Sequence, residues 1–276
     1  MKKLPFTKMH GLGNDFVVLD EITETPRNCK GVIPEKFPTA LARRLCDRRF
    51  GVGCDQILRL VPAHDPTRAD LRMEILNADG SLAEMCGNGI RAVGLYLSRY
   101  WKKETEFKIE TLAGLQIVWI EGPEVRVNMG IPRLSQKAEK LDLGGNHTVE
   151  FREVSMGNPH AVIFSDKVAS VPLETFGPQI EKHLRFPQRT NVEFVQVLSK
   201  EKIQVRVWER GAGVTLACGT GACASAAAAQ AAGFVGNLCE VVLPGGSLRI
   251  DWKGGTAPLY MTGPAEEVFF GQFDIA

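Results

Sequence analysis

The sequence predicts an α+β protein made of two pseudo-symmetric halves. The segment Met85–Gly89, Met-Cys-Gly-Asn-Gly, returns as Ala-Cys-Gly-Thr-Gly over Ala217–Gly221, and the two cysteines lie 218 − 86 = 132 positions apart in a chain of 276 residues. At the same offset, residues 71–76 fall on residues 203–208, and both segments alternate like half-buried strands. Strand and helix patterns also occur together in each half. A repeat of this size is a domain rather than a solenoid unit.

The elements expected in the first half follow from apolar spacing and from turn-forming residues. Leu41 and Leu45 lie four positions apart, as on one face of a helix, and Gly51 and Gly53 would end that helix. Prolines, a glycine and mixed charges mark the segment 21–35 as an exposed loop. In chain order we expect a strand pair over 6–20, a helix over 38–49, strands over 56–61 and 71–76, a helix from Cys86 to Trp101, and strands over 107–110, 116–121 and 124–128.

The second half repeats this mixture. Its helix after Cys218 is made mostly of alanine, the best helix former, and Gly233 is a suitable stop. No low-complexity linker separates the halves, so the boundary predicted near residue 120 rests on the repeat alone. The other elements expected here are strands over 149–155, 160–165, 192–198 and 203–208, a helix over 174–184, and strands from the alanine-rich helix to the end.

Composition narrows the classes of partner. The net charge is +1, with 33 basic and 32 acidic residues and no long basic run, which argues against nucleic acid or an anionic membrane as the main partner. No stretch of 18 apolar residues occurs, and the first ten residues lack the apolar core of a secretory signal. Seven scattered cysteines do not form a disulfide framework. We therefore expect a cytoplasmic protein with no nucleic-acid partner and no membrane partner.

The two Cys-Gly-X-Gly segments are the strongest functional signal. A Gly-rich turn that opens a helix leaves backbone N–H groups without intrahelical acceptors, at the positive end of the helix dipole. There the N–H groups can hold a carboxylate or a developing oxyanion, and the pKa of each thiol, Cys86 and Cys218, is expected to fall. A thiol on each side of a bound molecule could remove a proton from one face and return one to the other.

Other interpretations of these segments were weighed. A metal site is disfavoured because the chain has no Cys-x-x-Cys and its five histidines show no ligand spacing. A dinucleotide site is suggested by G-x-G-x-x-A at Gly87–Ala92 and by Glu110, but about ten residues separate the strand from the first glycine. The remaining five cysteines are expected to be small core residues.

With these residues in hand, the chain resembles the diaminopimelate epimerases over nearly its whole length. The segments that carry the resemblance are His10–Phe16, Gly51–Gln56, Asn77–Ser81, Glu84–Gly89, Met156–His160, Asn191–Val192, Glu209–Gly213 and Thr215–Ala222. The resemblance implies two domains, each a barrel-like sheet around a central helix, with the active site in the cleft between them. With the boundary taken from the repeat, the predicted domains are residues 1–120 and 121–261. The resemblance implies that residues 262–276 return to the first domain and that the protein is a homodimer.

The implied reaction interconverts LL- and meso-diaminopimelate in lysine and cell-wall precursor biosynthesis, without pyridoxal phosphate, any other cofactor or a metal. Cys86 and Cys218 would be the catalytic pair, a thiolate base and a thiol acid that exchange roles with direction. His160 and Glu209 would tune the two thiols. The residues implied to bind substrate are Asn14, Gln56, Asn77, Gly87, Asn88, Asn158, Asn191, Glu209, Arg210, Gly219 and Thr220.

Departures from the family pattern are few. Val214 stands where the family usually has Glu, and Glu193 occupies a position often filled by a smaller residue, where it could alter the distal end of the pocket. Two alternatives stay open. One is a cofactor-independent racemase of the same fold, of the proline or hydroxyproline type. The other is a non-catalytic, redox-sensing binding protein that uses the same two thiols.

Overall fold

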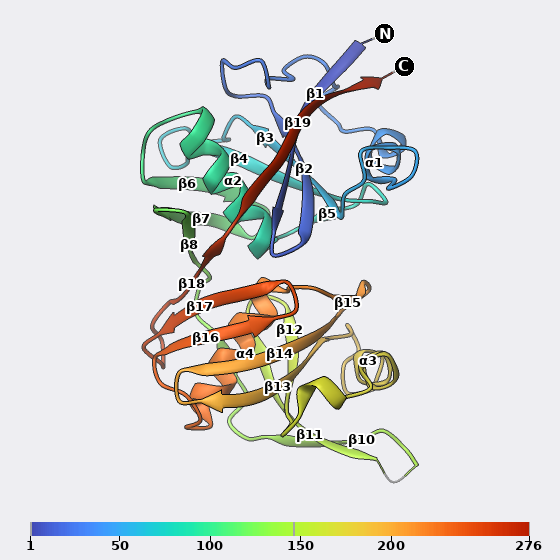
Figure 1. The fold of residues 1–276 in the computed structure, drawn as a ribbon, viewed down its shortest axis with the longest axis vertical. Coiled ribbons are helices and arrows are strands. Elements are labelled where there is room, and N and C mark those ends of the chain that lie inside the picture. Colours follow the sequence, from blue (N-terminus) through green and yellow to red (C-terminus); the bar gives the residue numbers. More distant parts are fainter. Residues whose placement is uncertain (1, 146, 276) are drawn as a thin grey trace. The chain divides into compact units, whose positions relative to one another are not determined.

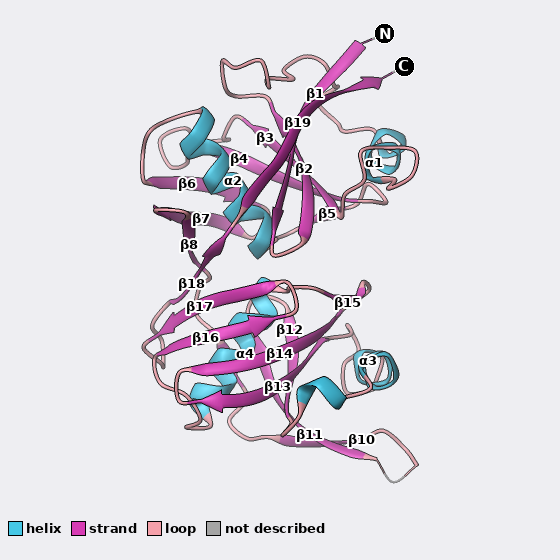
Figure 2. Cartoon of the chain, in the orientation of Figure 1, coloured by secondary structure: helices cyan, strands magenta, loops and turns pink. Residues whose placement is uncertain are grey.

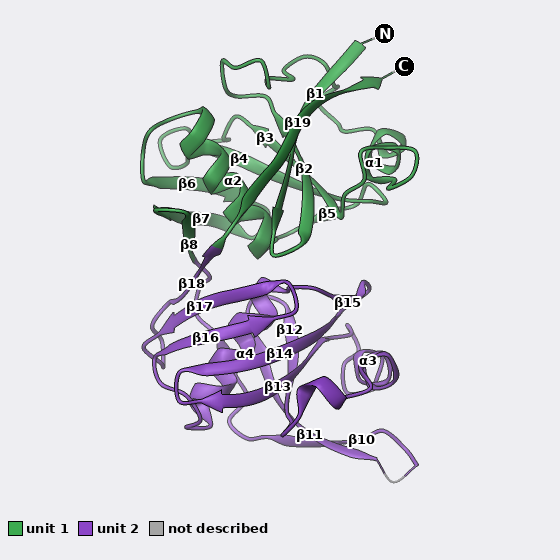
Figure 3. Ribbon diagram, in the orientation of Figure 1, with its two compact units in different colours: residues 1–127, 264–276 green, residues 128–263 purple. Residues whose placement is uncertain are grey.

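The computed structural model describes residues 2–145 and 147–275, which form two compact units (Figure 3). Unit 1 contains the chain up to Val127 together with the segment from Pro264 onward, and unit 2 runs from Asn128 to Gly263. The first boundary therefore follows Val127 rather than lying near residue 120. The reason is that strand β8 (Glu124–Asn128) pairs with β7 (Gly114–Glu121), and Val125 and Val127 are fully buried.

Unit 1 is an eight-stranded mixed sheet with two helices, and strands predominate in it (Figure 2). Successive pairings give the order β19-β1-β2-β3-β4-β6-β7-β8, in which β2–β3 and β4–β6 are parallel and the other pairs are antiparallel. The short strand β5 (Leu82–Ala83) pairs with β4. The remaining elements are β1 (Lys2–Gly11), β2 (Asn14–Asp20), α1 (Thr39–Cys46), β3 (Gln56–Val61), β4 (Leu71–Asn77), α2 (Gly87–Tyr100), β6 (Glu106–Thr111) and β19 (Glu266–Ile275).

Unit 2 has the same topology. Its sheet runs β11-β12-β13-β14-β16-β17-β18, with β12–β13 and β14–β16 parallel, and β15 (Gly213–Thr215) pairs with β14. Strands β9 (Arg133–Leu134) and β10 (Glu139–Asp142) pair with β11. The other elements are β11 (Thr148–Ser155), β12 (Pro159–Phe164), the 3-10 turn η1 (Val168–Ser170), α3 (Leu173–Glu181), β13 (Asn191–Ser199), β14 (Lys202–Glu209), α4 (Gly219–Ala231), β16 (Leu238–Leu243), β17 (Gly246–Trp252) and β18 (Leu259–Pro264).

The repeat read from the sequence is a repeat of structure. Along the chain, helix α1 connects the parallel strands β2 and β3, and α3 in the same way connects the parallel strands β12 and β13. Helix α2 follows β4 and β5 and leads to β6, just as α4 follows β14 and β15 and leads to β16. The expected pairs of elements are therefore confirmed, and a polar residue, Asn77 or Glu209, closes each strand that precedes a cysteine.

Each unit has a central helix against which its strands pack (Figure 1). Helix α2 contacts β1, β2, β7 and β19, and its residues 87–97 are all buried. A Cβ added at Gly94 would lie 3.0 Å from Val125, so glycine is needed where α2 approaches β8. Helix α4 contacts β11, β12, β13, β14, β16 and β17, and its alanines let that sheet approach closely. The expected barrel-like sheet around a helix is thus present in each unit.

The differences from the predicted elements are local. Helix α1 ends at Cys46, three residues before the predicted end, because Asp47 takes an extended conformation. The two- to four-residue strands β5, β9, β10 and β15 were not predicted, since strands so short carry no readable alternation. Among the described residues, no helix combines the length and the apolar character that crossing a membrane requires.

An ionic cluster around Asp15 ties the start of β2 to its neighbours in unit 1. The Asp15 carboxylate accepts hydrogen bonds from Lys8 Nζ at 2.6 Å and from both terminal nitrogens of Arg48 at 2.9 and 2.7 Å. Burial alone would raise the pKa of Asp15, but the hydrogen bonds and charges of Arg48 and Lys8 lower it to about 2. Arg48 also bonds Asp55 at 2.6 Å, so the cluster fixes the segment that leads into β3.

We predict that Asp15→Asn lowers the free energy of unfolding at pH 7 and weakens its dependence on pH. The pKa of Asp15 is lower in the folded chain than its ordinary value of 3.8, so the stabilisation is present above that value and is lost as the pH falls towards about 2. Urea unfolding at several pH values measures this loss. Asp166→Asn, at an exposed carboxylate of unit 2 outside the cluster, is the control. An Asp15→Asn curve parallel to the parent curve would contradict the prediction.

Candidate active site

Each predicted catalytic cysteine is the N-cap of a central helix. Cys86 precedes α2 with φ −138° and ψ 106°, and Cys218 precedes α4 with φ −119° and ψ 113°. The Gly89 N–H donates to Cys86 Sγ at 3.3 Å, and the Gly221 N–H donates to Cys218 Sγ at 3.4 Å. Sulfur thus takes the place that a Ser or Asp oxygen usually fills at this position. The two halves build one local geometry, which holds each sulfur at the positive end of a helix.

In unit 1 the Cys86 sulfur faces a carbonyl oxygen. The Cys86 thiol donates to Asn14 Oδ1 at 3.7 Å, and Asn88 Nδ2 donates to the same oxygen at 3.2 Å. Asn14 Nδ2 in turn donates to the Asp55 carboxylate at 2.8 Å. Because the amide nitrogen of Asn14 is engaged by Asp55, its oxygen is the atom presented to the thiol. We call Cys86, Asn14, Asn88 and Asp55 the first half-site.

Two further contacts support the first half-site. Gln56 Nε2 donates to Asn77 Oδ1 at 2.9 Å, which joins the start of β3 to the end of β4. Arg91 is fully buried on α2 and donates to Gly87 O and to Asn88 Oδ1, each at 3.0 Å. Arg91 therefore fixes the loop from inside the fold. The Asn88 side chain is held by these internal bonds.

In unit 2 the side-chain amide has the opposite orientation: Asn158 directs its nitrogen, rather than its oxygen, towards the cysteine loop. Asn158 Nδ2 donates to Thr220 Oγ1 at 3.3 Å, and Thr220 Oγ1 lies 3.5 Å from Cys218 Sγ. The Asn158 oxygen faces His160 Nε2 at 3.0 Å. His160 is buried and its Nδ1 lies 2.7 Å from Glu193 Oε1. We call Cys218, Thr220, Asn158, His160 and Glu193 the second half-site.

Glu193 does not reach towards a pocket, as its position after Asn191 had suggested. Its carboxyl group is completely buried, and a Cβ added at Gly221 would lie 2.7 Å from Glu193 Oε1. The side chain therefore points inward, beneath the start of α4. The reason is the alternation of β13, which turns Glu193 to the same face as Asn191 and Val195 and towards the central helix.

Asn191, Glu209 and Arg210 come together where β13 begins and β14 ends. Asn191 Nδ2 donates to Pro159 O at 2.9 Å, and Asn191 Oδ1 accepts from the Arg210 backbone N–H at 2.9 Å. This amide is a clamp between strands. The Arg210 side chain is exposed, with a long contact of 3.4 Å to Gln188 O, and Glu209 Oε1 accepts from Thr215 Oγ1 at 2.6 Å. Arg210 is thus the exposed cation of this group.

The electrostatics of Cys218 differ from the sequence expectation. Burial, followed by the charges of Glu209 and Glu193, raises the pKa of Cys218 well above its ordinary value. The hydrogen bonds from Thr220 and from the Gly221 N–H act in the expected direction and lower it. They are outweighed, because the thiol is only 6% exposed and two carboxylates lie near it. The raised pKa favours the neutral thiol of Cys218, the form that can donate a proton.

The structure thus groups the predicted residues into two sets, one in each unit. Sequence analysis did not find the supporting roles of Asp55, Arg91 and Glu193. Each of them is a charged residue beside or inside an apolar run, and that pattern is the signal which could have revealed it. Among residues 2–145 and 147–275, no group of three or more His, Cys, Asp or Glu side chains is arranged to hold a metal ion.

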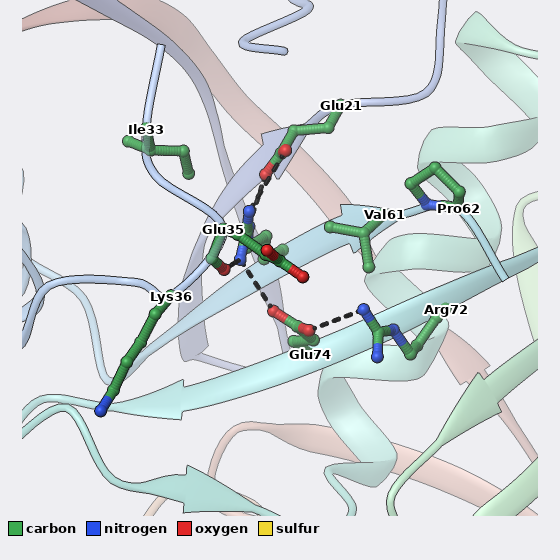
Figure 4. A pocket seen from close by; sticks show the side chains of 9 residues that line it. Glu21, Ile33, Glu35, Lys36, Val61, Pro62, Arg72 and Glu74 are labelled. Carbon is green, nitrogen blue, oxygen red and sulfur yellow. Dashed lines mark hydrogen bonds and ion pairs between the residues drawn. The ribbon is translucent and has the colours of Figure 1, made fainter. Parts of the chain in front are cut away.

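A pocket of about 660 Å³ lies in unit 1, and Cys86 is not among its lining residues (Figure 4). Arg59 crosses it from β3 and forms ion pairs with Glu21 and with Glu74, the latter at 3.1 Å. Its other lining residues include Ile33, Glu35, Lys36 and Arg72. Because Arg59 also donates to the backbone of Glu35, these charges attach the long loop after β2 to the sheet. We assign them a structural role.

Comparisons with known proteins were made on sequence and on structure. A family model described as Diaminopimelate epimerase matches residues 6–135 and 152–268. The diaminopimelate epimerase of Carboxydothermus hydrogenoformans is 48% identical over 282 residues, covering 98% of this chain and 99% of the relative. That of Pelotomaculum thermopropionicum is 48% identical over 286 residues, covering 97% and 98%.

Solved structures share the fold at low sequence identity. A hydroxyproline epimerase from Agrobacterium vitis matches with a TM-score of 0.73 and 17% identity, over 99% of this chain and 91% of that chain. A probable proline racemase from Agrobacterium radiobacter matches with a TM-score of 0.71 and 18% identity, over 99% and 93%. At these identities the likeness concerns the fold alone.

We predict that Glu209→Gln lowers the pKa of Cys218. The substitution removes a charge that raises this pKa, while the amide oxygen can still accept from Thr215. Since the thiolate is the reactive form, alkylation of Cys218 by iodoacetamide should reach a given rate at a lower pH. Peptide mass spectrometry at a series of pH values measures that rate.

The matched control is Glu240→Gln, because Glu240 is a unit 2 carboxylate paired with Lys202 at 3.0 Å rather than a contributor to the pKa of Cys218. The control should leave the profile in place. A Glu209→Gln profile that is unchanged, or displaced to higher pH, would show that Glu209 does not act on this thiol.

Proposed function

The chain belongs to the diaminopimelate epimerase family and is a cofactor-independent isomerase that interconverts LL- and meso-diaminopimelate, and we propose that Cys86 and Cys218 are its two acid–base groups. The observation that carries this proposal is the pair of cysteine N-caps, since each helix start holds its sulfur in the same geometry. A thiol at both helix starts suits proton transfer at two faces of one carbon.

Epimerisation at a carbon that bears one hydrogen requires loss of that proton from one face and gain of a proton at the other. One thiolate takes the α-proton and becomes a thiol, and the other thiol gives its proton and becomes a thiolate. The electron pair left on the α-carbon spreads into the adjoining carboxylate. In the direction in which Cys218 is the acid, its neutral state is the form required. The reverse direction exchanges the roles.

We propose that the helix starts bind this carboxylate. The backbone N–H groups of Gly87, Asn88, Gly219 and Thr220 are the first of their helices, and the first N–H groups of a helix have no intrahelical acceptors. They favour negative charge, and that charge grows as the proton leaves. His160 and Glu209 would adjust the thiols, as Glu209 does through its charge near Cys218.

The remaining polar side chains are proposed to bind the rest of the substrate. Diaminopimelate carries two carboxylates and two ammonium groups, so it needs both donors and acceptors. The exposed guanidinium of Arg210 can take a carboxylate through two parallel hydrogen bonds. The amides proposed to contribute donors and acceptors are Asn14, Gln56, Asn77, Asn158 and Asn191. The proline-racemase alternative is supported only by likeness of fold.

We predict that Cys86→Ala and Cys218→Ala each reduce epimerisation by about a hundredfold to ten-thousandfold, the usual contribution of a general acid or base. Proton NMR in D2O, with LL- and meso-diaminopimelate as substrates, measures both isomer conversion and exchange of the α-hydrogen. Cys239→Ala is the control, because Cys239 is a buried thiol of β16. Undiminished conversion by either alanine variant would refute the two-thiol mechanism, and absence of any exchange by the parent protein would refute catalysis.

We also propose that the protein forms a homodimer and works in the cytoplasm. Apolar side chains of β19, at the edge of the unit 1 sheet, are exposed: Val268 by 54%, Phe269 by 46% and Phe270 by 40%. An exposed apolar strand of this kind suits an interface between copies. All seven cysteines are free thiols, which suits a reducing compartment. Sedimentation equilibrium should give a dimer that Val268→Asp weakens, and a monomeric parent protein would contradict the interface.

A further inference from the structure

The two half-sites differ in one buried pair of residues. The parallel pairing of β2 with β3 sets Phe16 beside Gln56, and that of β12 with β13 sets His160 beside Asn191. Counting two residues onward along β3 and β13 makes Leu58 the counterpart of Glu193. A Cβ added at Gly89 would meet Leu58 at 3.1 Å, and one added at Gly221 would meet Glu193 at 2.7 Å. The side chains of Phe16, Leu58, His160 and Glu193 are fully buried. An apolar pair in unit 1 is therefore replaced by a His–Glu pair in unit 2.

The hydrogen bonds of this pair determine where its protons lie. His160 Nε2 faces Asn158 Oδ1 at 3.0 Å, and an amide oxygen can only accept, so Nε2 carries a hydrogen. His160 Nδ1 faces Glu193 Oε1 at 2.7 Å, and one proton lies between these two atoms. Glu193 thus fixes the ring as an Nε2–H donor.

That donor fixes the Asn158 amide. With its oxygen held by His160, Asn158 turns its NH2 group towards Thr220 Oγ1 at 3.3 Å. Thr220 Oγ1 then accepts from Asn158, which leaves the hydroxyl hydrogen to be donated towards Cys218 Sγ at 3.5 Å. In unit 1 the order is reversed, because Asp55 takes the Asn14 nitrogen and the Asn14 oxygen faces Cys86. In the second half-site the Thr220 hydroxyl donates towards the Cys218 sulfur. In the first half-site the Asn14 oxygen accepts from the Cys86 thiol.

Resting on the epimerase function proposed above, we propose that Glu193 is a positioning residue for the reaction. Through His160 it holds the Asn158 amide and the Thr220 hydroxyl as donors towards Cys218, which stabilises the thiolate form that this cysteine takes when it has given up its proton. The charges of Glu209 and Glu193 both raise the pKa of this thiol. We call the chain of hydrogen bonds from Glu193 through His160, Asn158 and Thr220 to Cys218 the relay. It opposes the effect of the two charges by directing a hydrogen bond at the sulfur.

The location of Glu193 fits a positioning role better than a packing role. Glu193 Oε2 has no hydrogen-bond partner among the described residues, although it is buried. A leucine fills the counterpart position in unit 1, so packing against the glycine does not require a carboxyl group. A buried acid with one unbonded oxygen costs stability, and the start of α4 offsets only part of that cost. This loss of stability is explained if the other oxygen, Glu193 Oε1, serves the reaction through His160.

The test compares Glu193→Gln with Glu193→Leu. In the Gln variant the side-chain NH2 group can donate to His160 Nδ1, which keeps the hydrogen on Nε2, so kcat should stay within about threefold of the parent value. In the Leu variant Nδ1 loses its partner, and kcat should fall by about tenfold to a hundredfold with KM little changed. A Gln variant that loses as much as the Leu variant would overturn the proposal, because a charge rather than a position would then be required.

A second variant separates positioning from stability. His160→Phe combined with Glu193→Leu copies the Phe16–Leu58 pair of unit 1 into unit 2. Replacing a buried ion pair with apolar residues is often neutral or stabilising. We therefore expect unfolding by urea at or above the parent midpoint, with conversion at least tenfold slower. Parent-like kcat in this variant would also overturn the proposal.

A cycle with Asn158→Ala shows whether Glu193 acts through this amide. Glu193→Leu should slow Asn158→Ala much less than it slows the parent, because the relay is already broken there. Additive losses would overturn the relay. Failure of the underlying function is distinguishable, since the parent protein would then show no α-hydrogen exchange with diaminopimelate. Loss of the inference alone leaves the parent active.

Discussion

The structure depends on one arrangement that occurs twice, a buried helix whose first N–H groups converge on a cysteine sulfur. The first N–H groups of a helix have no intrahelical acceptors and need acceptors from outside the helix. Sulfur accepts the bond from Gly89 in one unit and from Gly221 in the other. The glycines are needed because Leu58 and Glu193 lie within 3.1 Å of any added Cβ. The same constraint that caps the helix also places a reactive atom.

Symmetry of the backbone does not extend to the chemistry. In unit 1 an apolar layer lies beneath the cysteine, and the polar contacts come from Asp55 and Asn14 at the side. In unit 2 the layer beneath the cysteine contains a His–Glu pair, and the direction of the amide is reversed. Two copies of one fold have thus acquired opposite hydrogen-bond polarity at equivalent sulfurs. This difference in hydrogen-bond polarity suits a reaction that needs an acid and a base at the same moment.

Burial has two opposing effects at Cys218. It strengthens the hydrogen bonds and the helix dipole that favour a thiolate, and it penalises the charged form directly. The penalty and the charges of Glu209 and Glu193 prevail, so the pKa of Cys218 is raised. The helix start alone does not make a thiolate. What the site supplies is a set of donors already directed at the atom where charge will form.

The sequence by itself determined the repeat, the central helices, the two cysteines and the family motifs, because these depend on local spacing and on residue types. It also placed Asn77 and Glu209 at equivalent strand ends. Only the tertiary structure decided which way each amide points, since that depends on partners remote in the chain: Asp55 lies 41 residues from Asn14, and Glu193 lies 33 residues from His160. It likewise decided that Glu193 points inward and that the pKa of Cys218 is raised, because burial and the approach of carboxylates on other strands leave no pattern in local sequence.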